Sequence, residues 1–227
     1  MTELSTYAFA DGVATITLDD GRVNALSQAM LAELMTHIAR AESEDAIIVL
    51  TGREKTFSAG FDLRCPPEKF LEMVCDGAKL AERLLAYPRP VVAACTGNAV
   101  AMGAFTLLAC DVRIGAAGPF KIGLNEVSIG LFVPWFGIEL ARHRLTPPYF
   151  DRCTITGAIL DPEEARTAGF LDEVVAPGAV ATVAEERAAG LAAVDAGAHR
   201  TTKARTRERV LAGVRDGIAR FADDRDV

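Results

Sequence analysis

The 227-residue sequence predicts an α/β fold built from repeated strand and helix units, and three observations support this prediction. Residues 12–18 alternate between apolar and other side chains with the period of two that is typical of a strand. Apolar residues then recur at helical spacing over residues 30–38, and residues 46–50 form the continuous apolar run expected of a strand covered on both faces. Strand, helix and buried strand in this order indicate a right-handed βαβ crossover.

The same unit repeats along the chain. Ser27 is the predicted N-cap of the first helix, and residues 66–85, which two prolines open, predict a second helix. A buried strand over residues 91–95, a third helix over residues 104–109 and a strand over residues 112–115 follow. No low-complexity segment interrupts the pattern, so we expect no linker between these units.

Helices dominate the rest of the sequence. The predicted elements are helices at 134–144, from 146 onwards, at 161–169, at 180–194 and at 201–221, with a short strand at 171–175. The pair Pro177-Gly178 marks the expected boundary between a core of residues 1–177 and a C-terminal helical region of residues 178–227.

Composition excludes several classes of protein. The net charge of -7 argues against a nucleic-acid partner or an anionic membrane surface, since both require a basic face. The first twelve residues lack the basic and apolar segments of a signal peptide, and no apolar run reaches transmembrane length, so we expect a cytoplasmic protein. The five cysteines show no C-x-x-C pair, which favours reduced core thiols and no metal site.

Glu126 stands out because it lies in an otherwise almost wholly apolar stretch, residues 121–135. Such a carboxylate is either an exposed loop residue or a base in a dry pocket, where desolvation raises its pKa toward the range useful for proton transfer. This stretch alone leaves both interpretations open.

Two connections that follow predicted strands are rich in small residues, residues 57–63 and residues 96–104. Glycine and alanine allow the backbone to approach a ligand closely, and the N–H groups at a helix start point outward at any oxyanion there. Each connection is therefore either a tight turn or half of an oxyanion hole.

Five segments together resemble the crotonase superfamily of enoyl-CoA hydratases and isomerases. They are GRVNALS, FSAGFDL, YPRPVVAACTGNAVAMGA, CDVRIG and GLNEVSIGLFVPW, and the likeness spans roughly residues 8–175. The resemblance implies a crotonase-like spiral of ββα units followed by a C-terminal helical region that assembles trimers, often paired into hexamers. It also implies an acyl-CoA thioester substrate, with coenzyme A as part of the substrate and no separate cofactor.

The resemblance assigns roles to individual residues. The N–H groups of Phe61 and Met102 are expected to bind the thioester oxygen, although relatives usually have glycine where Met102 stands, which puts the shape of the pocket in question. Other residues expected to contact the substrate or its coenzyme A part are Arg22, Ala59, Gly60, Asp62, Leu63 and Gly103. Asp62 also has an alternative role: an acid at the start of a helix more often caps the helix than assists chemistry.

The number of carboxylates distinguishes the reactions of this family. Its hydratases use two, and the position of the first corresponds here to Phe105, whereas Glu126 corresponds to the single base of the 3-enoyl to 2-enoyl-CoA isomerases. An apolar wall of Phe105, Phe132 and Trp135 would exclude water and raise the pKa of Glu126. The competing interpretation makes Phe105 ordinary core and Glu126 idle.

We therefore predict an isomerase with Glu126 as the shuttling base. The alternatives are a hydratase that works with one glutamate, and a family member that binds acyl-CoA or a partner protein without turnover. The basic residues between 199 and 209 are interpreted first as a solvated helix face and second as an edge of the coenzyme A site.

Overall fold

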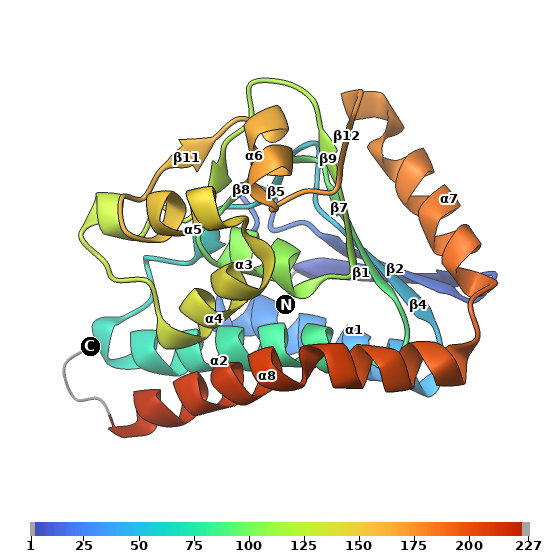
Figure 1. Ribbon diagram of the computed structural model, residues 1–227, viewed down its shortest axis with the longest axis horizontal. Coiled ribbons are helices and arrows are strands. Elements are labelled where there is room, and N and C mark those ends of the chain that lie inside the picture. The colour runs from blue at the N-terminus through green and yellow to red at the C-terminus, as the bar shows by residue number, and fades with distance from the viewer. Residues whose placement is uncertain (1–2, 224–227) are drawn as a thin grey trace.

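The computed structural model describes residues 3–223 as an α/β fold of repeated strand pairs and helices (Figure 1). Residues 1–2 and 224–227, the outer ends of the two expected regions, lie outside the described residues. The strands are β1 (Ser5–Ala10), β2 (Val13–Leu18), β3 (Ala25–Leu26), β4 (Ile47–Thr51), β5 (Lys55–Ser58), β6 (Gly60–Phe61), β7 (Val91–Cys95), β8 (Gly97–Val100), β9 (Val112–Ala116), β10 (Ile122–Gly123), β11 (Ile159–Leu160) and β12 (Glu173–Val175). The helices are α1 (Gln28–Ser43), α2 (Pro67–Ala86), α3 (Met102–Ala109), α4 (Trp135–Arg144), α5 (Pro147–Thr154), α6 (Pro162–Ala168), α7 (Val180–Ala192) and α8 (Ala196–Asp223), with 3-10 turns η1 (Val127–Ile129) and η2 (Pro177–Ala179).

Successive repeats place their strands in two different sheets before the chain enters a helix. β4, β7 and β9 are neighbours in a six-stranded sheet of order β1-β2-β4-β7-β9-β12. The strands that follow them, β5, β8 and β10, lie in a four-stranded sheet of order β11-β10-β8-β5. These repeated ββα units confirm the predicted fold class.

The N-terminal edge of the large sheet is a hairpin that the sequence reasoning missed. β1 pairs antiparallel with β2, and Asp11 and Gly12 form the two-residue loop between Ala10 and Val13. Both loop residues have positive φ angles, 51° and 77°, as a hairpin turn of the primed type requires. The dipeptide Asp-Gly before an alternating strand was the available signal for this hairpin.

The large sheet is covered on both faces. Ile48 and Leu50 of β4 belong to a core cluster shared with α1, α2 and α3, while Ile47 and Val49 belong to a second cluster with residues of α7. This confirms the prediction from the continuous apolar run at residues 46–50, because neither face of the strand contacts water.

The two C-terminal helices pack directly on the rest of the chain. α7 lies along the sheet, and α8 runs beneath α2 and packs against α2 and α4 (Figure 1). A Cβ atom at Gly217 of α8 would lie 2.7 Å from the backbone nitrogen of Phe136, so glycine permits the close approach of α8 to α4. A trimerisation role for residues 178–227 remains a prediction.

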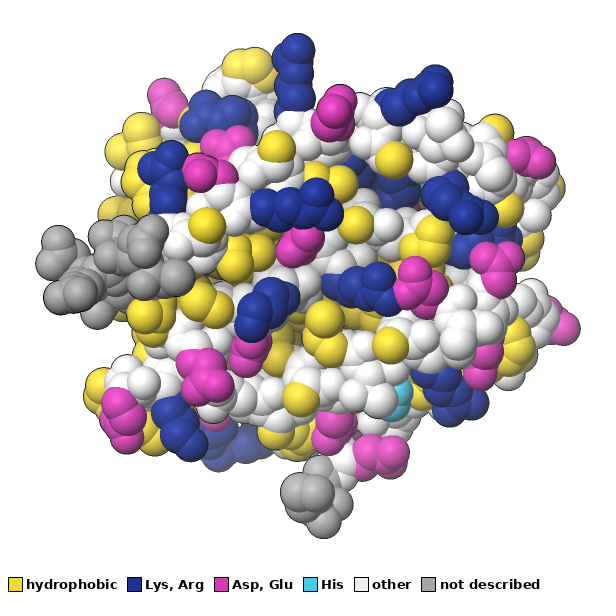
Figure 2. All heavy atoms as spheres, turned by 90° about the horizontal axis from the view of Figure 1, so that it is seen from below, with side chains coloured by type: hydrophobic (Ala, Val, Ile, Leu, Met, Phe, Trp, Pro, Cys, Tyr) yellow, Lys and Arg dark blue, Asp and Glu magenta, His cyan; other side chains and the backbone are white. Residues whose placement is uncertain are grey.

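Basic and acidic side chains are interspersed over the face that α8 and α2 present (Figure 2). Arg215 of α8 pairs with Glu82 of α2 at 2.6 Å, and Arg220 pairs with Asp216 within α8 at 2.8 Å. Within residues 3–223, no helix has the length and hydropathy needed to cross a bilayer. The same residues contain no cluster of three or more His, Cys, Asp or Glu side chains suited to a metal ion.

Candidate active site

The main chain around Glu126 forms a tight turn that fixes its side chain. Strand β10 delivers the chain to Leu124, and the carbonyl oxygen of Glu126 then accepts hydrogen bonds from the N–H groups of Ile129 (3.0 Å) and Leu131 (2.9 Å). Gly130, between these two donors, has a φ angle of 81°, which a residue without Cβ adopts without strain. The turn therefore holds Glu126 in one place rather than on a loose loop.

The Glu126 side chain is buried, so the exposed-loop interpretation is excluded. The residue is 6% exposed, and its Oε2 atom has no hydrogen-bond partner among the described residues. Burial raises the pKa of Glu126 from its ordinary value of 4.5 to about 7, and a hydrogen bond from its own backbone N–H opposes part of that rise. A carboxyl group with this pKa gains and loses a proton readily near neutral pH.

Glu126 opens into an apolar cavity of about 160 Å³. Among the described residues, Glu126 is the only lining side chain that can ionise; the others are aromatic or aliphatic. Phe132, which was expected in the apolar wall, lines this cavity, and so does Phe61, whose role as an N–H donor remains a prediction. A substrate alkyl group could occupy such a space, with its hydrogen atoms within reach of one carboxylate.

The two loops that carry the predicted oxyanion donors lie against each other. Gly60 has a φ angle of 89°, and a Cβ atom placed on it would lie 2.8 Å from Cβ of Ala101 and 3.2 Å from the backbone nitrogen of Met102. Glycine at this position is thus required by both its backbone conformation and the close contact. The main chain just before Phe61 therefore lies close to the backbone nitrogen of Met102.

Met102 begins α3, so its N–H is one of the first-turn donors that have no carbonyl partner inside the helix. Ala101, directly before it, has φ 50° and ψ -125°, a strained conformation for a residue with a Cβ atom. The Ala101 N–H donates to the carbonyl of Gly123 at 3.0 Å. That bond fixes the start of α3 to the strand that leads to Glu126.

The side chain of Met102 does not obstruct the cavity. It is fully buried and points toward α2, where a Cβ atom on Gly77 would lie 3.2 Å from its sulfur atom. Met102 is absent from the residues with positive φ, which satisfies the condition for donating its N–H in place of glycine. Its sulfur atom thus occupies space between α3 and α2 rather than space for a ligand.

The expected apolar wall of Phe105, Phe132 and Trp135 is correct only for Phe132. Phe105 is fully buried and packs edge to face on Phe136, with ring centroids 5.4 Å apart, so it is a core residue. Trp135 is 49% exposed, and the guanidinium of Arg220 lies 4.7 Å from its ring centroid. Neither Phe105 nor Trp135 lines the cavity.

Five lining residues were not predicted from the sequence. They are Phe70 and Val74 of α2, Leu131 and Pro134 of the segment after Glu126, and Phe221 of α8. The segment 123–135 did point to an apolar surround, but α2 and α8 reach the cavity only through tertiary packing, for which local spacing carries no signal.

The residues expected at the coenzyme A side fall into two groups. Arg22 lies on an exposed turn beside Ala59, because the N–H of Ala59 donates to the carbonyl of Val23 at 3.0 Å, and Leu63 is 62% exposed. Gly103 instead packs inward, since a Cβ atom on it would lie 2.5 Å from the carbonyl oxygen of Ser58. The exposed group could contact a ligand, whereas Gly103 contacts the chain itself.

The prediction that Asp62 caps a helix is wrong. α2 begins at Pro67, and the Asp62 carboxylate instead accepts from the N–H of Arg64 (3.1 Å) and from its guanidinium (2.8 and 2.9 Å). The hydrogen bonds from Arg64 hold the pKa of Asp62 below its ordinary value. Asp62 is therefore a stable anion rather than a proton donor.

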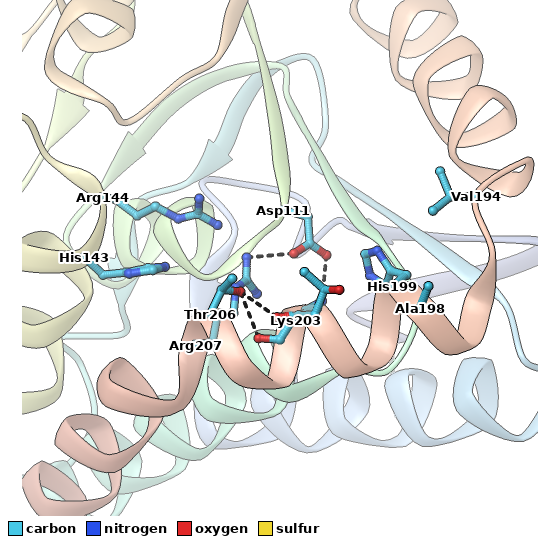
Figure 3. Close-up of a pocket in the computed structure, with 10 residues that line it drawn as sticks. Asp111, His143, Arg144, Val194, Ala198, His199, Lys203, Thr206 and Arg207 are labelled. Carbon is cyan, nitrogen blue, oxygen red and sulfur yellow. Dashed lines mark hydrogen bonds and ion pairs between the residues drawn. The ribbon is translucent and has the colours of Figure 1, made fainter.

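A second cavity, of about 570 Å³, lies between α8, the C-terminal end of α4 and Asp111, which follows α3 (Figure 3). Lys203 and Arg207 of α8 point at Asp111, with distances of 2.6 Å from Nζ to Oδ2 and 2.7 Å from Nη2 to Oδ1. Both cationic residues are less than 10% exposed. For Lys203 and Arg207 the interpretation as a solvated helix face is therefore wrong.

The cations of this cavity also bind main-chain carbonyls at helix ends. Arg207 donates to the carbonyl of Leu85 in α2 (3.0 Å), and Arg144 donates to that of Leu108 in α3 (3.1 Å). Cations at these ends stabilise the helix dipoles and satisfy carbonyls that have no partner within the helix. We therefore assign this charged cluster to the anchoring of α8.

Comparison with known proteins agrees with this geometry. The sequence profile described as Enoyl-CoA hydratase/isomerase matches residues 8–216. A crystal structure of an enoyl-CoA hydratase/isomerase family protein from Pseudomonas syringae superposes with a TM-score of 0.95 at 42% identity, covering 97% of each chain. The apo structure of an enoyl-CoA isomerase from Mycobacterium tuberculosis gives a TM-score of 0.95 at 40% identity, covering 99% of this chain and 100% of that one.

A protein named as a putative hydratase is also similar. The putative enoyl-CoA hydratase of Thermus thermophilus is 34% identical over 225 residues, which cover 91% of this chain and 85% of that protein. Similar proteins thus have names from both reactions, which leaves the reaction itself open. The fold, the profile match and these identities together show that the chain belongs to the enoyl-CoA hydratase/isomerase family of the crotonase superfamily.

Proposed function

We propose that the protein shifts the double bond of a 3-enoyl-CoA to the 2-position, with Glu126 as the only base. The observation that carries this proposal is that one buried carboxylate, and no second ionisable side chain among the described residues, lines the apolar cavity. The carboxylate removes a proton from C2 of the acyl group and returns it to C4 of the resulting dienolate. Both transfers can occur on one face of the substrate, so one base with a pKa near 7 is sufficient.

The thioester oxygen is proposed to lie between the N–H groups of Phe61 and Met102. The closeness of the Gly60 main chain to the Met102 nitrogen and the helix start at Met102 support this placement. Two donors aimed at the oxygen stabilise the negative charge that develops there during enolate formation, and removing one such donor typically costs about 3 kcal/mol of transition-state stabilisation. In this arrangement the exposed turn with Arg22, Ala59 and Leu63 would face the coenzyme A part.

Hydration of a 2-enoyl-CoA is the second candidate, because the Thermus relative is named as a hydratase. Addition of water requires a water molecule to be held and polarised beside the double bond. The cavity offers apolar walls and one carboxylate for this purpose. We therefore expect hydration to be the slower of the two reactions.

A paired assay separates these functions. Purified protein is given 3-hexenoyl-CoA in one reaction and 2-hexenoyl-CoA in another, and the ultraviolet absorbance of the conjugated thioester is followed. An isomerase increases this absorbance in the first reaction, whereas a hydratase decreases it in the second. Faster loss in the second reaction would contradict the proposal, and binding of both thioesters without any absorbance change would identify a non-catalytic binder.

The pH dependence of isomerisation gives a further prediction. Because burial raises the pKa of Glu126 to about 7, its basic form predominates only above that pH. We expect kcat/KM to fall about tenfold for each pH unit below about 6, with an acid limb centred near pH 7. A stopped-flow profile from about pH 5 to about 9 measures this limb. A kcat/KM that stays nearly constant down to the lower end, as the ordinary glutamate pKa of 4.5 would give, would contradict the buried base.

Assembly into trimers or hexamers also remains a proposal from the family resemblance, and so does a cytoplasmic location. Sedimentation velocity of the full chain measures the first directly.

A further inference from the structure

We propose that Phe221, near the end of α8, closes the acyl part of the Glu126 cavity and restricts the protein to short acyl chains. The inference rests on the proposed function, because it names the substrate class of the same site. It concerns a residue that lies far from Glu126 in the sequence and that reaches the cavity only because α8 lies along α2 and α4.

The size of the cavity sets the length of the chain. Its volume is about 160 Å³, and the described residues that line it are apolar apart from Glu126. An apolar cavity of about 150 Å³ in another protein holds one benzene molecule, so the space here accommodates roughly six carbon atoms. A chain of twelve carbons, by contrast, does not fit within this volume.

The direction of the chain follows from the residues at each wall. If the thioester oxygen lies at the N–H of Phe61 and C2 lies at Glu126, the loops of the core occupy the reacting end. Next to Glu126 the wall comes from Leu131, Phe132 and Pro134, and farther from the reacting end it comes from Phe70 and Val74 of α2 and Phe221 of α8. The tail of the acyl group therefore extends toward α2 and α8.

Phe221 is held in place by its packing. It is 2% exposed, and its ring lies 6.4 Å from the ring of Phe136, which in turn packs on Phe105 in the core. One turn earlier, Gly217 sits against the backbone of Phe136. These contacts oppose movement of the Phe221 ring, so it acts as a fixed stop rather than a side chain that yields to a longer substrate.

Binding of saturated acyl-CoAs tests the inference without any chemical step. Isothermal titration of the full chain with butanoyl-, hexanoyl- and dodecanoyl-CoA should show that hexanoyl-CoA binds about tenfold tighter than dodecanoyl-CoA. In Phe221→Ala, dodecanoyl-CoA should gain about tenfold in affinity, while hexanoyl-CoA changes by less than about threefold. Ile218→Ala is the matched control, because Ile218 lies on the same helix and packs against the core without lining the cavity; it should keep the wild-type preference.

A second variant tests the same end of the cavity while Phe221 is kept. Val74→Phe fills part of the cavity from the α2 side and should weaken binding of hexanoyl-CoA about tenfold while butanoyl-CoA still binds. Equal affinities of wild-type protein for hexanoyl- and dodecanoyl-CoA, or a Phe221→Ala variant with the wild-type preference, would overturn the inference. A protein that prefers hexanoyl-CoA but does not isomerise 3-hexenoyl-CoA would support the inference and contradict the proposed function, so the two failures are distinguishable.

Discussion

Replacing Glu126 by glutamine should lower kcat/KM for 3-enoyl-CoA by on the order of a thousandfold or more. The amide has nearly the size of the carboxyl group, but it can neither accept the proton from C2 nor return it to C4. No other ionisable side chain among the described lining residues can take over this role. The absorbance assay with 3-hexenoyl-CoA measures the loss.

The same variant should be more stable than the wild-type protein at pH 8. Because burial raises the pKa of Glu126, the folded chain holds this proton more tightly than the unfolded chain does. The stability that this proton contributes is fully present below pH 4.5 and is lost as the pH rises through about 7. The difference between those two pKa values corresponds to about 3 kcal/mol, an upper limit because the glutamine amide also lacks partners in an apolar cavity.

Thermal unfolding at pH 8 and at pH 4 therefore complements the activity assay. We expect Glu126→Gln to raise the melting temperature at pH 8, with a difference that shrinks at pH 4. Glu163→Gln is a suitable control, because Glu163 lies in the first turn of α6 on the surface, paired with Arg166 at 3.1 Å. If Glu126→Gln retains activity within about tenfold of wild type, Glu126 is not the base.

Most of the fold could be predicted from the sequence because buried positions carry apolar residues at a spacing typical of each element. Residues 46–50 are apolar on both faces because α7 covers one side of β4 and the core helices cover the other. Ser27 was predicted as an N-cap from its residue type, and its hydroxyl oxygen accepts from the N–H of Met30. In each case, a local chemical requirement is visible in the sequence itself.

The second sheet was not predicted, because its strands are too short to show a pattern of apolar residues. β10 and β11 have two residues each, and β5 and β8 have four, too few for an alternation to be recognised. Their pairing depends on close approach: a Cβ atom on Gly97 would lie 2.0 Å from the carbonyl oxygen of Lys55 in the neighbouring strand. Glycine there marks a backbone contact, but the sequence does not say with which strand.

The candidate site divides in the same way. A single acid in an apolar stretch drew attention to Glu126, and small residues drew attention to the loops at residues 57–63 and 96–104, but their expected roles came from the family resemblance. Phe105 was misplaced because an aromatic residue near a predicted site can equally belong to the core, and only its contact with Phe136 distinguishes the two. Phe221 lies 95 positions after Glu126, and only the path of α8 brings it to the cavity.

Asp111→Asn should reduce the free energy of unfolding by about 3 to 5 kcal/mol. Asp111 accepts from Lys203 (2.6 Å), from Arg207 (2.7 Å) and from the backbone N–H of Val91 (2.8 Å). Asparagine retains the shape and can still accept from Val91, but it leaves two buried cations without an opposite charge. Removing one member of a buried ion cluster lowers the free energy of unfolding by more than the whole cluster contributes to it, because the remaining charges stay buried away from water without a partner.

Urea unfolding of the full chain measures this effect, and two further variants define its cause. Asp216→Asn removes an acid from the exposed pair with Arg220 on the same helix and should change stability by less than about 1 kcal/mol. Adding Lys203→Met to Asp111→Asn should recover part of the loss, because it removes one of the two unpaired charges, and this non-additivity is the signature of a shared cluster. If the double variant is instead as unstable as the sum of the two single changes, α8 is anchored by its apolar contacts with α2 and α4, and the charged cluster contributes little to holding it there.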